Sequence, residues 1–198
     1  MSAQLENLQL KTDHKETQLI ENITQNITQL NDLINSLLLL SKADAKNSGT
    51  QETARIDEAI YNSIEQVHHQ FPDFKVALEI SSSEEMEQLL EQHCNQGLLE
   101  IAFSNLLKNA YLYSDNGQAK IEMQPHAERL QISIQNSGPT LSTHEQEKMF
   151  EPFTRGENAK NQSGFGLGLR IVHRILSVYD VSIEYIGQSD NNIFVIEF

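Results

Sequence analysis

A glycine-rich run near the C-terminal end of the chain has the composition of a phosphate-binding turn. Gly164, Gly166 and Gly168 alternate with Phe and Leu, and an apolar pattern with helical spacing begins directly after them. Glycines at a helix N-terminus let main-chain N–H groups approach an anion, and the helix dipole favours negative charge there. The run lacks the Lys-Ser/Thr pair of a Walker A loop and the preceding strand of a Rossmann turn. Taken alone, it is equally compatible with a flexible glycine turn.

Two asparagines lie one turn apart on a strongly apolar segment, 98–113, that is expected to be a helix. Asn105 and Asn109 are four residues apart, so their side chains share one helix face. Amide oxygens suit a hard cation such as Mg2+, which keeps most of its waters and binds phosphates at the same time. The alternative is a pair of ordinary surface asparagines.

Two further motifs stand between the asparagines and the glycine-rich run. The sequence N-S-G-P at 136–139 follows an alternating, strand-like run. The sequence M-F-E-P-F-T-R-G at 149–156 places aromatic residues within an otherwise polar stretch, 138–163. Apolar side chains within a polar loop indicate a lid that is anchored at one place.

Together the four motifs resemble the N, G1, F and G2 boxes of the catalytic domain of sensor histidine kinases. In chain order they read N-L-L-K-N-A at 105–110, N-S-G-P at 136–139, F-E-P-F-T-R-G at 150–156 and G-F-G-L-G-L at 164–169. The resemblance covers residues 55–198. It implies the Bergerat fold of the GHKL group, an α+β sandwich with a mixed, mostly antiparallel sheet and helices on one face. ATP would lie between the N-box helix and a mobile lid.

The resemblance assigns roles to five residues around the metal and the base. Asn109 would coordinate Mg2+ at the phosphates, with Asn105 beside it, and Tyr113 would line the nucleotide site. Asn136 would accept a hydrogen bond from the adenine amino group in place of the family's usual Asp. Gly138 would let the base approach the main chain.

The remaining roles concern the triphosphate. By resemblance, Gly164, Gly166 and Gly168 would surround the phosphates, and Leu169 would pack behind them. Arg155 would reach the triphosphate when the lid closes. The implied cofactors are ATP and Mg2+.

The chain departs from the family pattern at three places in these boxes. Leu112 stands where many members have a basic residue, Asn136 replaces the Asp, and Thr140 replaces the second G1 glycine. Because a charged acceptor makes a stronger hydrogen bond than a neutral amide, Asn136→Asp is expected to tighten ATP binding by up to about tenfold. The departures leave open a degenerate nucleotide-binding or interaction module.

The family's phosphoacceptor motif, His-Glu-x-x-Thr-Pro, does not occur in the chain. His14 is followed by Lys-Glu-Thr-Gln, with no proline nearby. By resemblance, the γ-phosphoryl group of ATP would pass to a histidine outside this fragment and then to the receiver domain of a response regulator. The chain would be the catalytic portion of a protein histidine kinase, inactive alone in autophosphorylation.

The main rival within the superfamily is a GHKL-type ATPase. Those enzymes carry a Glu as general base four residues before the metal-binding Asn, where this chain has Asn105. An amide cannot accept a proton from water. Transfer to a neutral imidazole needs no such base, so this residue favours the kinase.

The N-terminal part of the chain has a heptad pattern. Six apolar residues recur at spacings of three and four: Ile20, Ile23, Ile27, Leu30, Ile34 and Leu37. They predict a helix over about 14–43 that resembles the second helix of the family's dimerisation hairpin. We therefore expect a partial dimerisation and phosphotransfer segment over 1–46, a linker over 47–54 and the catalytic domain over 55–198. The full-length receptor would be a homodimer.

After the linker, periodicity predicts an alternation of helices and strands. Helical spacing covers 56–67, 98–113 and 167–179. Strand-like alternation or apolar runs cover 73–81, 120–124, 130–135, 181–186 and 193–198. The serine-rich stretch over 81–85 is expected to be a solvated loop.

Composition and charge limit the possible partners. With 38% hydrophobic and 21% charged residues, the chain is neither disordered nor a membrane bundle. Its formal charge of −14 repels nucleic acid. The single cysteine, Cys94, excludes an internal disulfide and fits a reducing compartment. We expect a cytoplasmic location, as part of an inner-membrane receptor, with no membrane contact by this fragment.

Overall fold

The computed structural model describes residues 19, 23, 34, 52–152, 154 and 166–198. The chain divides into two compact units, Met1–Leu38 and Leu39–Phe198. In the first unit the three described residues, Leu19, Ile23 and Ile34, are helical and about half exposed. The predicted helix is thus confirmed at these positions, and the other seam residues lie outside the described ones.

The second unit is built on a mixed five-stranded sheet with the order β2-β4-β5-β7-β6. Its strands are β2 (Lys75–Ile80), β4 (Gln118–His126), β5 (Arg129–Ser137), β6 (Ser182–Gln188) and β7 (Asn191–Glu197). β2 runs parallel to β4, and the other neighbouring pairs are antiparallel. All five predicted strands are confirmed, because burial of one face imposes the period of two that the sequence displays.

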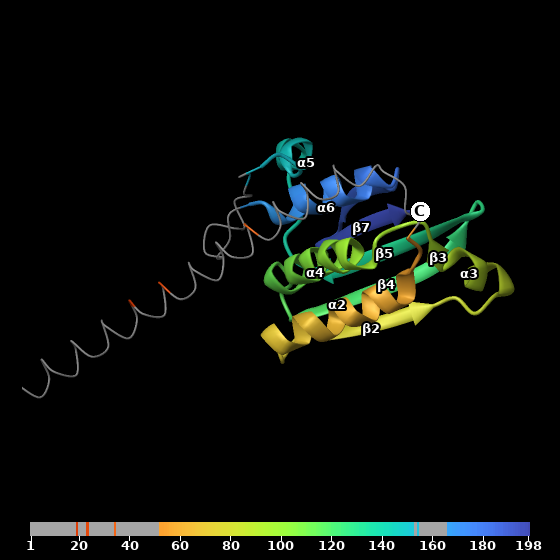
Figure 1. Cartoon of the computed structure of the whole chain (residues 1–198). Helices are drawn as coiled ribbons and strands as arrows, with labels where there is room; N and C mark the ends of the chain where they lie inside the picture. The colour runs from red at the N-terminus through yellow and green to blue at the C-terminus, as the bar shows by residue number, and fades with distance from the viewer. Residues whose placement is uncertain (1–18, 20–22, 24–33, 35–51, 153, 155–165) are drawn as a thin grey trace, which may run out of the picture. The chain divides into compact units, whose positions relative to one another are not determined.

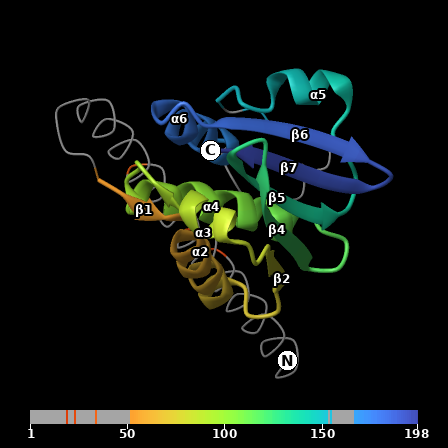
Figure 2. The same ribbon diagram turned by 90° about the vertical axis from the view of Figure 1, so that its right-hand side faces the viewer.

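Three helices cover one face of this sheet, which gives the two layers seen in Figures 1 and 2. They are α2 (Ile56–Gln70), α4 (Gln96–Leu112) and α6 (Gly168–Val178). The core between the layers is apolar, with Leu106, Ile132 and Leu176 fully buried. The expected α+β sandwich with helices on one face is confirmed. No helix in the described part of the chain is long and apolar enough to cross a bilayer.

Several short elements were not predicted. β1 (Ala54–Arg55) pairs with β3 (Glu91–Gln92), so Ala54, the last residue of the expected linker, is already part of a strand. The expected loop over 81–85 is wrong from Glu84 on, where α3 (Glu84–Leu89) begins. The Ser83 hydroxyl caps this helix by accepting a hydrogen bond from the Met86 N–H (3.1 Å).

Candidate functional site

The N-terminus of α6 lies against the α4 face that carries the paired asparagines. A Cβ on Gly168 would lie only 3.1 Å from Asn105 Oδ1, so glycine permits this close approach. The Asn105 Nδ2 donates to the Ile101 carbonyl (2.8 Å), which leaves Oδ1 as the amide atom facing α6. Two motifs far apart in the sequence, the N box and the glycine-rich run, therefore meet.

Asn109 is half-buried one turn further along α4. Among the described residues its side chain has no hydrogen-bond partner, so its amide oxygen can accept a ligand. The same residues contain no group of three His, Cys, Asp or Glu side chains that could hold a metal ion. A cation here would depend on amide oxygen, water and the ligand's own phosphates. That donor set fits Mg2+, which prefers oxygen ligands and keeps several waters.

The described part of the glycine-rich run opens α6 as expected. Gly166 has φ +69°, a conformation that favours glycine. Gly168 is the first residue of α6, and Leu169 packs partly buried against the core. Gly164 and Arg155 lie outside the described residues.

Asn136 is a buried polar residue with a fixed orientation. It is 5% exposed, and its Nδ2 donates to the main-chain carbonyls of Tyr113 and Ser137, both at 3.2 Å. Of the two ends of an asparagine amide only the NH2 group can donate, so Oδ1 is the end left to accept from a ligand. This geometry argues against the expected gain in ATP affinity for Asn136→Asp, because a carboxylate oxygen would face two carbonyl oxygens.

Gly138 is required by a close main-chain contact. A Cβ at this position would lie 2.1 Å from the carbonyl oxygen of Tyr113, the residue directly after α4, and φ is +149°. The neighbouring Ser137 carbonyl accepts from the Asp115 N–H (3.0 Å). The chain leaving β5 therefore lies directly against the end of the N-box helix, and Asn136 and Tyr113 are brought together.

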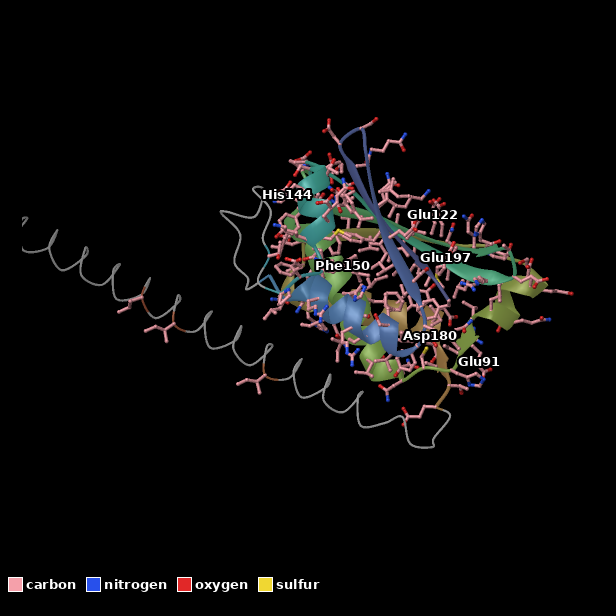
Figure 3. The ribbon with its side chains drawn as sticks, turned by 90° about the horizontal axis from the view of Figure 1, so that it is seen from above. Glu91, Glu122, His144, Phe150, Asp180 and Glu197 are labelled. Atoms are coloured by element: carbon pink, nitrogen blue, oxygen red, sulfur yellow. The ribbon has the colours of Figure 1, made fainter. Side chains whose placement is uncertain are left out.

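The polar stretch expected to form a lid contains a short helix, α5 (Thr143–Lys148). Ser142 and Glu145 form a capping box at its start, and none of its residues is buried. The Phe150 ring stacks against His173 of α6, with ring centroids 4.9 Å apart. Phe150 lies between α5 and α6 in Figure 3. This contact agrees with the expectation of an apolar attachment, although Met149 also packs against the core. That the stretch is a lid stays a prediction, and Phe153 lies outside the described residues.

Two further residues near Gly138 were missed by the sequence analysis. The Tyr185 hydroxyl accepts from the Leu141 N–H (2.9 Å) and donates to Asn192 Oδ1 (2.6 Å). Burial raises the pKa of Tyr185 above its ordinary value, the Leu141 N–H opposes this, and the charge of Glu145 adds to it. An available signal was that Asn192, 6% exposed, interrupts the apolar inward-facing positions of its strand.

Comparison with known proteins assigns the family. Residues 94–198 match the family model described as histidine kinase-, DNA gyrase B- and HSP90-like ATPase. This chain belongs to that family, whose members use ATP. At the level of the catalytic domain, its homologues are sensor histidine kinases, as the four boxes indicated.

Individual relatives agree with this assignment. The heme sensor protein HssS of Staphylococcus saprophyticus subsp. saprophyticus is 32% identical over 161 residues, which cover 80% of this chain and 34% of HssS. The chain thus spans about a third of the length of this curated relative.

Solved structures show the same fold. The Acinetobacter baumannii histidine kinase AdeS matches with a TM-score of 0.65 and 23% identity, over 91% of this chain and 83% of that one. Full-length ShkA, solved in complex with AMPPNP, matches with a TM-score of 0.63 and 20% identity, over 83% and 34%.

Proposed function

We propose that this chain is the ATP-binding catalytic portion of a sensor histidine kinase. It transfers the γ-phosphoryl group of ATP to a histidine outside its 198 residues, for signalling to the receiver domain of a response regulator. The observation that carries the proposal is the meeting of Asn105 with Gly168, which joins a cation-binding motif to a phosphate-binding helix N-terminus. Homology with HssS over 80% of the chain supports the kinase class.

The described residues supply three parts of an ATP site. Main-chain N–H groups at the start of α6 bind phosphate oxygens, because they are not used within the helix and the dipole favours negative charge. The Asn109 oxygen would hold Mg2+, and the ion would neutralise charge on the phosphates. The free Oδ1 of Asn136 accepts from the adenine amino group, which is a donor that guanine lacks at that position.

The chemistry needs little from the protein beyond positioning. A neutral imidazole nitrogen attacks the γ-phosphorus with its lone pair, a P–N bond forms, and the bond to the β–γ bridging oxygen breaks to release ADP. No side chain has to activate the nucleophile. A water nucleophile would need a general base. Asn105 cannot be that base, because its NH2 group donates to the Ile101 carbonyl and the atom that faces Gly168 is an amide oxygen. This local chemistry favours the kinase over the ATPase.

The organisation of the whole protein belongs to the same proposal. Residues 1–46 form part of the hairpin through which the receptor becomes a homodimer, 47–54 link it to the catalytic domain, and 55–198 bind ATP and Mg2+ in the cytoplasm. The ligand-binding set is Asn105, Asn109, Tyr113, Asn136, Gly138, Arg155, Gly164, Gly166, Gly168 and Leu169, with Asn109 on the metal.

Incubation of the purified chain with γ-labelled ATP and Mg2+ separates the candidate activities. We expect bound ATP, no phosphate release above background, and no label in the protein. Sustained phosphate release would identify an ATPase. Acid-labile label at His14 would overturn the external acceptor, and failure to bind ATP would indicate a degenerate module.

A further inference from the structure

We propose that Tyr185 and Asn192 are positioning residues that hold the 138–141 loop in its adenine-binding shape. This inference rests on the proposed ATP-binding function, because the loop begins two residues after Asn136, the proposed adenine ligand. Neither side chain has to touch the nucleotide. They act by connecting both ends of the loop to the β6–β7 hairpin.

The far end of the loop is fixed through Leu141. Its N–H donates to the Tyr185 hydroxyl (2.9 Å), and its carbonyl accepts from Gln146 Nε2 (2.8 Å). Both main-chain groups of Leu141 are thus satisfied by side chains from different elements, β6 and α5. A shift of this end of the loop would break both of these hydrogen bonds.

The near end is fixed through Gly138. Its N–H donates to the Asp190 carbonyl (2.8 Å) in the β6–β7 turn, and its carbonyl accepts from Asn192 Nδ2 (3.3 Å). Asn192 is also the direct cross-strand neighbour of Asn136, so the two buried amides lie side by side on β7 and β5.

One continuous set of hydrogen bonds joins the two ends. The Tyr185 hydroxyl has one proton, and it donates this proton to Asn192 Oδ1 (2.6 Å) while it accepts from Leu141. The NH2 group of Asn192 in turn donates to the Gly138 carbonyl. Each donor and acceptor has a defined role, so removal of the single hydroxyl leaves both the Leu141 N–H and the Asn192 oxygen without this partner.

The hairpin is also shaped to let the loop approach. A Cβ on Gly187 would lie 3.1 Å from the Thr140 Cβ and 3.1 Å from the Tyr185 hydroxyl oxygen. The absent side chain therefore leaves room for Thr140, which stands where the family pattern has a second G1 glycine. Loop and hairpin are complementary in shape as well as in hydrogen bonding.

Pre-ordering of a binding loop lowers the entropy that the ligand must overcome. The contacts described here act only on the loop beside Asn136 and not on the start of α6, where phosphates are proposed to bind. Loss of the hydroxyl should therefore weaken binding of the adenine part of ATP and leave binding of a bare polyphosphate unchanged. A residue that merely supports the fold would weaken both.

The test is calorimetry on Tyr185→Phe with Mg-ATP and, separately, with Mg-tripolyphosphate. The matched control is Tyr111→Phe, which also removes a tyrosine hydroxyl from a side-chain hydrogen bond, to Asp73, away from the loop. We expect Tyr185→Phe to lose about fivefold to tenfold in ATP affinity with tripolyphosphate affinity unchanged, and Tyr111→Phe to bind both ligands normally. Asn192→Asp, which keeps the acceptor but removes the donor to Gly138, should show the same selective loss.

The outcomes distinguish this inference from the function on which it rests. Wild-type protein that fails to bind ATP would overturn the proposed function and this inference with it. Normal wild-type binding together with unchanged ATP affinity in Tyr185→Phe and Asn192→Asp would overturn the inference alone. Equal losses for ATP and tripolyphosphate would also overturn it, because they would indicate a structural role. Amide exchange of Leu141 in the nucleotide-free protein should accelerate in Tyr185→Phe only.

Discussion

At the scale of single residues, Gly138 is the described glycine at which an added side chain would meet the shortest contact. A Cβ would lie 2.1 Å from the Tyr113 carbonyl oxygen, in a main-chain conformation that L-residues rarely adopt. We predict that Gly138→Ala lowers the free energy of unfolding by at least about 1–3 kcal/mol and abolishes measurable ATP binding.

A matched glycine substitution provides the control. Gly97 lies exposed in α4, where a Cβ would meet only ordinary contacts. Gly97→Ala should raise stability by about 0.4–1 kcal/mol, because alanine lowers the conformational entropy of the unfolded chain. Urea denaturation measures both variants, and equal effects would show that the contact with Tyr113 is unimportant.

Asn136 gives a second prediction at this scale. Asn136→Asp replaces an NH2 that donates to two carbonyls by an oxygen that must face them. We predict a loss of about 1–3 kcal/mol in stability and weaker ATP binding. Burial beside carbonyl oxygens raises the pKa of the introduced carboxyl above its value in the unfolded chain. The variant is therefore most stable at low pH, where the carboxyl is protonated, and loses stability as the pH rises through the raised pKa. Thermal unfolding from pH 4 to pH 8 tests this, and a variant more stable at pH 8 than at pH 4 relative to wild type would contradict it.

At the scale of elements, the predicted strands succeed where burial imposes a pattern. Ile132 and Ile134 are buried and alternate with outward polar residues, so the period of two is visible in the sequence. The short helices α3 and α5 have little such pattern, since α5 buries no residue. They depend instead on the capping residues Ser83 and Ser142, which look like ordinary loop serines when read without the structure.

The attachment of α5 leads to a prediction about this element. Its neighbour Phe150 contacts α6 through His173, and no residue of α5 itself is buried. We predict that Phe150→Ala accelerates amide exchange across 143–150 while the exchange of β4 and β5 stays unchanged. Phe194→Ala, which removes a buried ring from the core, should instead lower protection across the sheet. Equal protection of 143–150 in wild type and Phe150→Ala would show that other contacts hold α5.

Part of the candidate site could be predicted because its residues lie close together in the sequence. Asn105, Asn109 and the glycines are recognisable by residue type and by their spacing along one helix or one turn. Tyr185 and Asn192 do not, because their role arises from the pairing of β6 with β7 and from the approach of a loop that lies more than forty residues earlier in the sequence. Such a contact depends on the register between paired strands, and this register cannot be deduced from the local periodicity of the sequence.

At the scale of the whole molecule, the buried thiol of Cys94 makes the stability of the folded protein decrease at alkaline pH. Burial raises the pKa of this thiol to about 12, because the thiolate is disfavoured away from water. Its contribution to stability is therefore fully present below the unfolded pKa of about 8.5 and is lost as pH rises towards 12. We predict that the wild type loses stability more steeply between pH 9 and pH 11 than Cys94→Ala does. Parallel stability profiles of the two proteins would contradict this.

At the scale of the whole molecule, the proposed function requires the two-layer domain to hold Mg-ATP between α4 and α6. The most direct test is titration calorimetry of ATP into wild type and Asn109→Ala, each with and without Mg2+. We predict ATP binding to the wild type that is strengthened by Mg2+, and a loss of about tenfold, or about 1.4 kcal/mol, in Asn109→Ala when Mg2+ is present. Circular dichroism should show that the variant is folded. Mg-ATP affinity that is the same in wild type and Asn109→Ala, or no binding to either, would contradict the account.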